Sequence, residues 1–588
     1  MESAVKGFPM ERWRRMSREG YFRNDLKTIA EYSGYSSPQL RTPGRIHFGR
    51  RDRWVNDPSG LVYCDGVYHL FYQLNPFGTE WGNMHWGHAV SRNLLQWEHR
   101  PVAIAPHPEL GMAFTGSIVV DSGNCSGLFP GISTGFLALL TTARESTESD
   151  NPHQTQSIAY SCDRGETWRW YRKNPVIPNE GLRDFRDPKI VRHPESGSWV
   201  LSISAGTAIR FYRSENLVQW EWTSTYVLDD VPDVCECPNL IRFEGDEGDV
   251  WALTYSLSHP TDGRFPGVRY VTGTFDGRQF HRDSHPERRL DHGPDFYALQ
   301  AWYGLPRGSD PVVLAWANNP AYSHHLPEFR SGGTGMLTIP RRVSVVPGRT
   351  PPLVRQAPMT EGAARMPSRS ISTIQETGST VFDSVDPARP FQLELRAEAG
   401  VPSSLTIAVE YEAGNTGEER PTIPSGSARP PHSEGQYRSV LSLELDLDRS
   451  PGEMTLTRDT SLIPAPESMR ERRTIPLPNS APPFDLIAII EDGLVEFFVF
   501  DGTVTATYLL PDRGNSFRVR VSYDPAGITP AIDGDTLDPA APSDQAGVPG
   551  DSIVPEALEA SGNPSDGKTS RGPGFGSRET DPKKGGGS

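Results

Sequence analysis

The chain has 588 residues, which is too long for one ordinary hydrophobic core and predicts two domains with extensions. Its formal net charge of −16 argues against nucleic acid and anionic membranes as partners, because both would repel an acidic chain. No apolar run approaches the length of a membrane span. The 5 cysteines are few for a chain of this length and cannot all pair, which argues against a disulfide framework.

Residues 1–45 are polar and predict an N-terminal arm. The first residues carry several arginines but no apolar segment of the signal-peptide kind. We therefore expect a reducing, cytoplasmic location, or an extracellular one if the native start lies further upstream.

Residues 46–350 predict a propeller of short antiparallel strands. Residues 61–72 form a β-hairpin pattern around Asp65-Gly66. A strand ending, a polar turn and an aromatic residue then recur at intervals, as expected for propeller blades with inserted loops. The anchoring aromatics are Trp97, Trp168, Trp220 and Phe280.

A last blade fits residues 298–346, with strands expected at 312–316 and 336–339. Residues 351–370 are polar and Pro-containing and predict a linker. Alternating apolar residues over 371–540 indicate an antiparallel β-sandwich. Residues 541–588 are rich in Pro, Ser, Gly and Asp and predict a disordered tail. The fold class is therefore all-β, with a five-bladed β-propeller followed by a C-terminal β-sandwich.

Three acidic islands occur in the propeller region. They are residues 54–60 (WVNDPSG), 184–189 (DFRDPK) and 234–240 (VCECPNL). If residues 235–237 are extended, Cys235 and Cys237 pack into the blade and Glu236 enters the central channel. A zinc site is disfavoured because no second Cys/His pair has the spacing, and we expect no metal and no cofactor.

Inner strands of different blades converge at one mouth of the channel, so Asp57, Asp187 and Glu236 can meet there. Carboxylates in a pocket with aromatic walls suit cleavage of a glycosidic bond, which needs a nucleophile, a proton donor and stabilisation of positive charge. A non-catalytic carbohydrate-binding propeller is the alternative from another class.

The three islands, in this order, resemble the motifs of glycoside hydrolase family 32, the β-fructofuranosidases. The likeness runs from about Pro43 to Arg342. It implies Asp57 as nucleophile, Asp187 as transition-state stabiliser and Glu236 as acid/base. It also implies a set of side chains that hold a fructosyl ring: Asn56, Gln73, Trp81, Phe114, Ser117, Arg186 and Trp316. Asn239 departs from the family, where Asp is common, and Cys235 stands where other residues are usual.

The resemblance predicts a retaining hydrolase that releases terminal β-D-fructofuranosyl residues from levan or inulin, with sucrose as a further candidate. A fructosyltransferase or levan fructotransferase using the same covalent intermediate is the nearest alternative. His85 and His88 are expected to orient a loop, and Asp295 to cap a turn. The oligomeric state stays open.

Overall fold

The structure is a computed structural model that describes residues 45–539 with gaps. The gaps are residue 51, 145–152, 230–233, 246–247, 259–265, 329–334, residue 350, 368–370, 375–377, 387–388, 398–402, 413–436, 447–451, 461–466, 478–483, 511–516 and 525–529. The expected N-terminal arm, up to residue 44, and the expected tail lie outside the described residues. All described residues belong to one compact unit.

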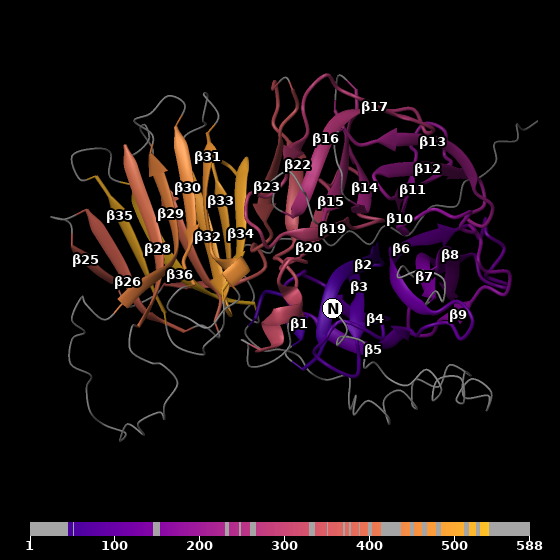
Figure 1. The fold of residues 1–588 in the computed structure, drawn as a ribbon, viewed down its shortest axis with the longest axis horizontal. Helices are drawn as coiled ribbons and strands as arrows, with labels where there is room; N and C mark the ends of the chain where they lie inside the picture. Colours follow the sequence, from indigo (N-terminus) through magenta and orange to yellow (C-terminus); the bar gives the residue numbers. More distant parts are fainter. Residues whose placement is uncertain are drawn as a thin grey trace, which may run out of the picture. The chain divides into compact units, whose positions relative to one another are not determined.

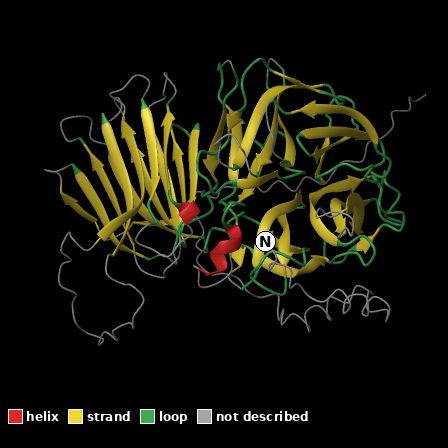
Figure 2. Cartoon of the chain, in the orientation of Figure 1, coloured by secondary structure: helices red, strands yellow, loops and turns green. Residues whose placement is uncertain are grey.

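Nearly every element is a β-strand, and the described residues hold only two short 3-10 helices, η1 (Ser323–Glu328) and η4 (Glu467–Met469) (Figure 2). No described helix is both long and apolar enough to cross a membrane. The many Gly and Pro residues of the chain stand between short strands, as expected for an all-β fold with many turns.

Five antiparallel blades form the propeller, as predicted, and each has four strands in sequence order, with one extra short strand in blade 4 (Figure 1). Blade 1 is β2 (Trp54–Cys64), β3 (Val67–Asn75), β4 (His85–Ser91) and β5 (Glu98–Ile104). Blade 2 is β6 (Met112–Ser122), β7 (Thr134–Arg144), β8 (His153–Ser161) and β9 (Arg169–Trp170). Blade 3 is β10 (Phe185–Arg192), β11 (Trp199–Ala205), β12 (Ala208–Ser214) and β13 (Glu221–Val227).

Blade 4 is β14 (Cys235–Phe243), β15 (Val250–Leu257), β16 (Gly267–Phe275) and β17 (Phe280–Arg282), with β18 (Arg288–Arg289) also paired to β16. Blade 5 is β19 (Tyr297–Ala301), β20 (Val312–Trp316), β22 (Arg341–Val345) and β23 (Val354–Pro358). The ring closes where Tyr303 N donates to Leu61 O at 2.9 Å and Tyr63 N donates to Tyr303 O at 2.8 Å.

The segment 336–339 joins blade 5 as predicted, since Leu337 bridges Trp316 and Thr338 N donates to Ala315 O at 2.9 Å. Met336 also belongs to β21 (Gly335–Met336), which pairs with β1 (Gly49–Arg50). The predicted linker, in contrast, is wrong. The fourth strand of blade 5 is β23, which lies inside the expected linker 351–370, and β24 (Ala364–Pro367) from the same segment pairs in the sandwich. β23 escaped notice because one of its inward-facing residues is the polar Gln356.

The sandwich consists of a six-stranded and a seven-stranded antiparallel sheet, drawn in orange to yellow in Figure 1. The first is β24, β36 (Ala531–Asp538), β27 (Phe391–Arg396), β32 (Asp485–Glu491), β33 (Leu494–Val499) and β34 (Val504–Leu509). The second is β25 (Ile371–Ile374), β26 (Ser379–Val385), β35 (Phe517–Tyr523), β28 (Ser404–Glu412), β29 (Tyr437–Asp446), β30 (Glu453–Arg458) and β31 (Glu471–Pro476). Their inner faces share one apolar core.

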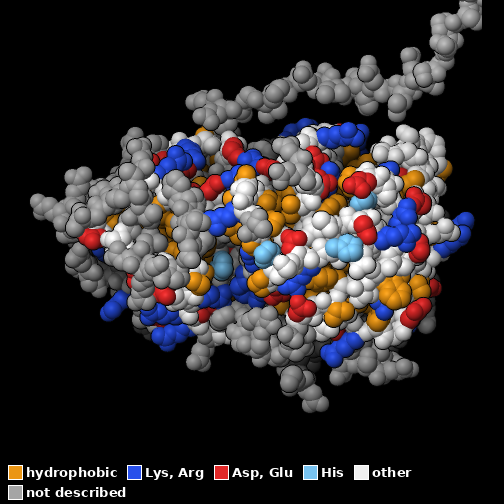
Figure 3. All heavy atoms as spheres, turned by 90° about the horizontal axis from the view of Figure 1, so that it is seen from above, with side chains coloured by type: hydrophobic (Ala, Val, Ile, Leu, Met, Phe, Trp, Pro, Cys, Tyr) orange, Lys and Arg blue, Asp and Glu red, His pale blue; other side chains and the backbone are white. Residues whose placement is uncertain are grey.

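Apolar clusters also fill the spaces between neighbouring blades; Phe71 of blade 1, for example, packs in one cluster with Phe136 of blade 2. The predicted aromatic anchors lie in these interblade contacts: Trp97 and Trp168 are buried and open the outer strand of their blades. On the face drawn in Figure 3, acidic and basic side chains lie among one another over the described part of the surface.

Every inner strand of the propeller carries a β-bulge at the same level. In each, the antiparallel register skips two residues before it resumes. The skipped residues are Asn56-Asp57 in β2, Phe114-Thr115 in β6, Asp187-Pro188 in β10, Cys237-Pro238 in β14 and Ala298-Leu299 in β19. A bulge inserts one residue and turns its side chain in a new direction. The three acidic islands are therefore three of these five bulges.

Candidate active site

The bulges of blades 3, 4 and 5 share a further feature. Their first residues, Asp187, Cys237 and Ala298, have φ of 65°, 50° and 51°, in the left-handed region that non-glycine residues seldom occupy. Strain of this kind persists only where the surroundings hold it, and it concentrates at functional sites.

Asp57 and Asp187 are brought together by Cys237. The Cys237 thiol lies 3.7 Å from Oδ2 of Asp57 and 3.6 Å from Oδ2 of Asp187, and its backbone N–H donates to the same Asp187 oxygen at 2.9 Å. Carboxylates 130 residues apart thus share one sulfur neighbour. Burial, followed by the two carboxylate charges, raises the pKa of the thiol, which therefore stays protonated and can donate.

The expectation that both cysteines pack into the blade is correct for Cys235 and wrong for Cys237. Cys235 lies in the core of blades 3 and 4 near Ser204. The alternation of a regular strand would place Cys237 beside it, but the bulge and the positive φ turn the thiol of Cys237 toward Asp57 and Asp187. All five cysteines are free, in line with the expected lack of disulfides.

Asp57 accepts two further hydrogen bonds. Thr115 Oγ1 donates to its Oδ2 at 2.7 Å, and Asn56 Nδ2 donates to its Oδ1 at 3.1 Å. Burial raises the pKa of Asp57 to about 6; the Thr115 hydrogen bond opposes this rise, and the charge of Glu236 adds to it. The group is therefore largely ionised at neutral pH and becomes protonated in mild acid.

Asp187 is also buried, and burial raises the pKa of its carboxyl. The Arg186 guanidinium opposes that rise, while the charges of Glu236 and Asp57 reinforce it. Asp187 N donates to Thr141 Oγ1 at 3.0 Å, which fixes the bulge on the neighbouring strand β7.

Glu236 is held from two sides by residues at equivalent positions of other blades. Arg186 Nε donates to its Oε1 at 3.0 Å, and the hydroxyl of Tyr297 donates to its Oε2. Arg186, Glu236 and Tyr297 are each the last paired residue before the bulge of their strand. Burial and then the Glu236 charge raise the pKa of Tyr297 far above its usual value, so the phenol keeps its proton.

Arg186 makes a second ion pair, from Nη1 to Asp184 Oδ1 at 2.8 Å. Burial lowers the pKa of this guanidinium, but the charges of Glu236 and Asp187 outweigh it and raise the pKa overall. The side chain is 14% exposed and so still reaches the mouth of the site.

The two tryptophans implied by the resemblance each have a group that no described residue occupies: an exposed ring in Trp81 and an indole N–H in Trp316. Trp81 is 44% exposed, with its ring 6.1 Å from that of Phe114 in an edge contact. Trp316 is buried, its ring 6.0 Å from that of Trp54, and its indole N–H has no partner among the described residues. A buried donor left open at a site is free to bind a ligand hydroxyl.

Gln73 and Ser117 are buried and engaged in contacts between strands. Gln73 Nε2 donates to Ala113 O at 3.1 Å, and Ser117 Oγ accepts from Ile190 N at 3.0 Å. These bonds hold β6 against its neighbours β3 and β10.

Both histidines lie in strand β4, and only His85 contacts the preceding loop as expected; His88 is packed in the blade with Phe71. His85 Nδ1 lies 2.6 Å from Asn83 O, and His88 Nε2 lies 3.1 Å from Nδ1 of His69. Burial lowers the pKa of His85 to about 4 and that of His88 well below 6.5, so both are neutral at pH 7 and neither supplies a proton readily.

Sequence reasoning missed three neighbours of the carboxylates: Thr115, Cys237 and Tyr297. All three stand inside the motifs that carry the family resemblance, which was the available signal. Asn239 is buried, with Nδ2 donating to Cys237 O at 3.1 Å and to Leu299 O at 2.7 Å, so it braces the bulges of blades 4 and 5.

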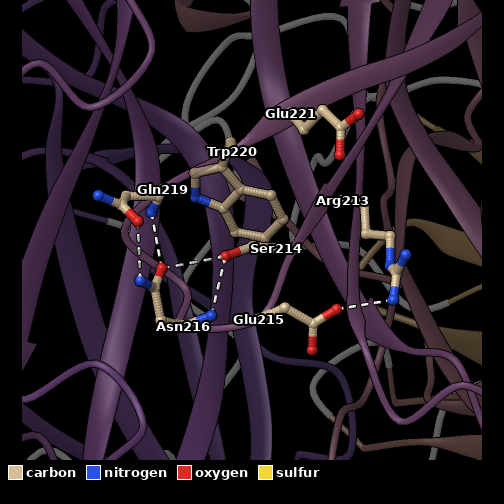
Figure 4. Close-up of a pocket in the computed structure, with 7 residues that line it drawn as sticks. All are labelled: Arg213, Ser214, Glu215, Asn216, Gln219, Trp220 and Glu221. Atoms are coloured by element: carbon tan, nitrogen blue, oxygen red, sulfur yellow. Dashed lines mark hydrogen bonds and ion pairs between the residues drawn. The ribbon is translucent and has the colours of Figure 1, made fainter.

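A separate hollow of about 400 Å³ lies at the outer turn of blade 3 (Figure 4). Its walls are the predicted repeat turn: Asn216 Oδ1 accepts from Gln219 N at 2.8 Å, and Trp220 Nε1 donates to Leu217 O at 3.0 Å. The same kind of turn occurs in blade 2, where Trp168 Nε1 donates to Gly165 O at 3.1 Å. The hollow therefore belongs to the blade structure and contains none of the three carboxylates.

A propeller whose channel strands bring two aspartates and a glutamate together, followed by a β-sandwich, defines a glycoside hydrolase. The family model described as "Glycosyl hydrolases family 32 N-terminal domain" matches residues 47–357. The chain belongs to glycoside hydrolase family 32.

The levanase of Bacillus subtilis (strain 168) is 41% identical over 309 residues, which cover 51% of this chain and 44% of that protein. The extracellular exo-inulinase of Aspergillus awamori is 33% identical over 419 residues, which cover 63% of this chain and 77% of that protein. A crystal structure of exo-inulinase from Aspergillus awamori superimposes with a TM-score of 0.69 at 27% identity, covering 86% of this chain and 99% of that one.

Proposed function

We propose that this chain is a retaining β-fructofuranosidase that releases terminal fructosyl residues from fructans of the levan or inulin type, and from sucrose. The observation that carries the proposal is the convergence of three carboxylates: one thiol contacts Asp57 and Asp187, and Glu236 directly precedes that cysteine. The levanase and exo-inulinase relatives support the substrate class.

In the proposed reaction, Asp57 attacks the anomeric carbon of the fructosyl unit. Glu236 protonates the departing oxygen, then removes a proton from water that hydrolyses the covalent intermediate. Asp187 stabilises the positive charge that develops on the ring. Asp57 suits the nucleophile because its hydrogen bonds from Thr115 and Asn56 orient one carboxylate and favour its ionised form.

The binding of the fructosyl unit falls to the side chains around the carboxylates. Trp81 offers an exposed ring face at the rim, and Trp316 an open N–H donor from the wall. Arg186 and Asn56 supply charged and amide donors next to Asp187 and Asp57. Sugars combine one apolar face with many hydroxyls, which suits a site of aromatic and planar polar groups.

Alanine substitution tests the assignment. Asp57→Ala, Asp187→Ala and Glu236→Ala should each lower turnover by about three orders of magnitude or more while the circular dichroism spectrum stays that of the wild type. Asp163→Ala is the control, because this acidic side chain accepts from Ser161 and Thr167 at the outer turn of blade 2 and contacts none of the three carboxylates in the described contacts. Wild-type fructose release by Asp57→Ala would refute the mechanism.

Product chromatography after incubation with sucrose, inulin and levan side by side decides between hydrolysis and transfer. Free fructose supports the proposed hydrolase. Longer oligosaccharides or a difructose anhydride would assign the same covalent intermediate to a transferase instead. Binding of fructan without any product would leave only a carbohydrate-binding role.

A further inference from the structure

One arginine of the sandwich is buried against the propeller. Arg458, the last residue of β30, is fully buried and donates from Nη1 to Asp295 Oδ2 at 2.6 Å. Its Nη2 donates to the hydroxyl of Tyr322 at 3.1 Å, and its Nε to Met469 O at 2.5 Å. Asp295 and Tyr322 belong to the propeller, so the guanidinium joins two propeller segments to the sandwich.

The first segment leads to Glu236. Asp295 accepts from Arg458, from Leu509 N at 2.8 Å and from the hydroxyl of Tyr322, so its carboxylate is fixed from three directions. Two residues further on, Tyr297 donates to Glu236. Because only Phe296 separates them, a shift of Asp295 moves the backbone that carries the Tyr297 hydroxyl.

The second segment leads to Asp57. Tyr322 immediately precedes η1, and in η1 the ring of His324 stacks on Trp54 with centroids 5.9 Å apart and planes 12° from parallel. Trp54 Nε1 donates to Asn56 Oδ1 at 2.9 Å, and Asn56 donates to Asp57. A direct hydrogen bond also ties the two segments together, since Asn319 Nδ2 donates to Pro294 O at 2.7 Å.

Apolar packing supports the same junction. Tyr322, Leu326 and Met336 of the propeller form one buried cluster with Met469, Leu494 and Leu509 of the sandwich. The rings of Tyr322 and Tyr508 each have the Arg458 guanidinium 5.4 Å from their centroids. Because packed interiors contain few voids, a displacement of the Arg458 side chain also displaces the propeller residues that contact it.

We infer that Arg458 of the sandwich is a positioning residue for Glu236 and Asp57 in the propeller. It acts through Asp295 on Tyr297 and through Tyr322 on the stack of His324 and Trp54. The inference gives the sandwich a part in catalysis, and it rests on the roles proposed above for Glu236 and Asp57.

The test compares folded variants of the full chain in the hydrolysis of sucrose, inulin and levan. Arg458→Met should lower kcat on the order of 10–100-fold, as expected for misplacement of reacting groups by a fraction of an ångström to one ångström. It should also shift the pH profile of kcat/KM, because the hydrogen bond that Tyr297 gives Glu236 changes. Arg458→Lys, which keeps the charge, should restore part of the loss.

The matched control is Arg45→Met. Arg45 Nη1 forms a 2.7 Å ion pair with Asp492 of the sandwich, but in the described contacts it does not touch the segments around Asp295 or Tyr322. This variant should lower the unfolding temperature without moving the pH profile. If Arg458→Met fails to fold, Tyr322→Phe removes one hydroxyl from the same junction and should shift the profile in the same direction.

A double-mutant cycle with Tyr297→Phe completes the test. Arg458→Met should cost less in the Tyr297→Phe background than in the wild type, since part of its effect passes through that hydroxyl. Full additivity, or wild-type kcat and pH profile in both Arg458→Met and Tyr322→Phe, would overturn the inference. Activity retained by Glu236→Gln would instead refute the proposed function.

Discussion

The Sγ atom of Cys237 lies 3.7 Å from Oδ2 of Asp57, and it reaches that place because a β-bulge turns the cysteine out of the regular alternation of its strand. The contact lowers the pKa of Asp57 somewhat, because a protonated thiol donates to the carboxylate and favours its charged form.

Cys237→Ala should therefore raise the pKa of Asp57 and move the acid limb of kcat/KM to higher pH. The lost hydrogen bond is worth about 1 kcal/mol, so kcat/KM at pH values on the acid side of the profile should fall roughly 5-fold. Cys235→Ala is the matched control, because its thiol lies near Ser204 and not near Asp57. Identical pH profiles for the two variants would contradict the prediction.

The wild-type enzyme should lose kcat/KM as the pH falls through about 6, where Asp57 becomes protonated. Thr115→Val removes the 2.7 Å hydrogen bond that favours the ionised form, so its acid limb should lie at higher pH. Thr142→Val serves as a control, since this buried hydroxyl bonds only with Thr155 and Ser157 in the described contacts. Steady-state rates from pH 4 to 9 measure all three limbs.

His47 makes the junction of the two domains sensitive to alkali. Its ring lies 2.6 Å from Glu491 and 2.9 Å from Glu496. Burial alone would lower the pKa of His47, but the hydrogen bonds and charges of the two glutamates outweigh it and raise the pKa to about 9. The folded state thus binds this proton more tightly than the unfolded chain does.

The resulting stability is fully present below pH 6.5 and is lost as the pH rises through about 9. At most it amounts to ~3 kcal/mol. Unfolding temperatures recorded between pH 6 and 10 should fall over this window, and the fall should be smaller in His47→Gln. An equal fall in both proteins would show that other groups cause it.

Trp81 should contribute to substrate binding rather than to the chemical step. Removal of a half-exposed aromatic platform costs about 1 kcal/mol, so Trp81→Ala should raise KM for inulin roughly 5-fold and leave kcat within about 2-fold. Trp222→Ala is a suitable control because Trp222 is 56% exposed on the outer strand of blade 3. A drop in kcat without a change in KM would place Trp81 in the chemistry instead.

The fold class could be predicted from the sequence because the blades repeat a polar turn followed by an aromatic residue. In the sandwich strands, apolar and polar residues alternate regularly. β23 was missed for the opposite reason. Its inward-facing Gln356 is paired with Arg341, so a buried position looks like a solvent-exposed one. A hydrophobic pattern cannot reveal a polar residue whose partner lies elsewhere in the fold.

The carboxylates Asp57, Asp187 and Glu236 could be chosen from their motifs, but their mutual contacts could not. Asp295 shows the same limit. The sequence suggested only a local role for it as a turn cap, whereas in the structure it is paired with an arginine 163 residues away. Long-range ion pairs of this kind leave no periodic trace in the sequence. The cytoplasmic location stays a prediction.

The recurring bulge gives blades 3, 4 and 5 equivalent positions for functional side chains around one axis. Ala298 of blade 5 occupies the place that Asp187 and Cys237 fill in blades 3 and 4. Because the hydrogen-bond ladder resumes just beyond each of them, a side chain can be exchanged there with little effect on the neighbouring pairs. New chemistry can therefore evolve, or be designed, by substitution at one blade while the other four keep the architecture intact.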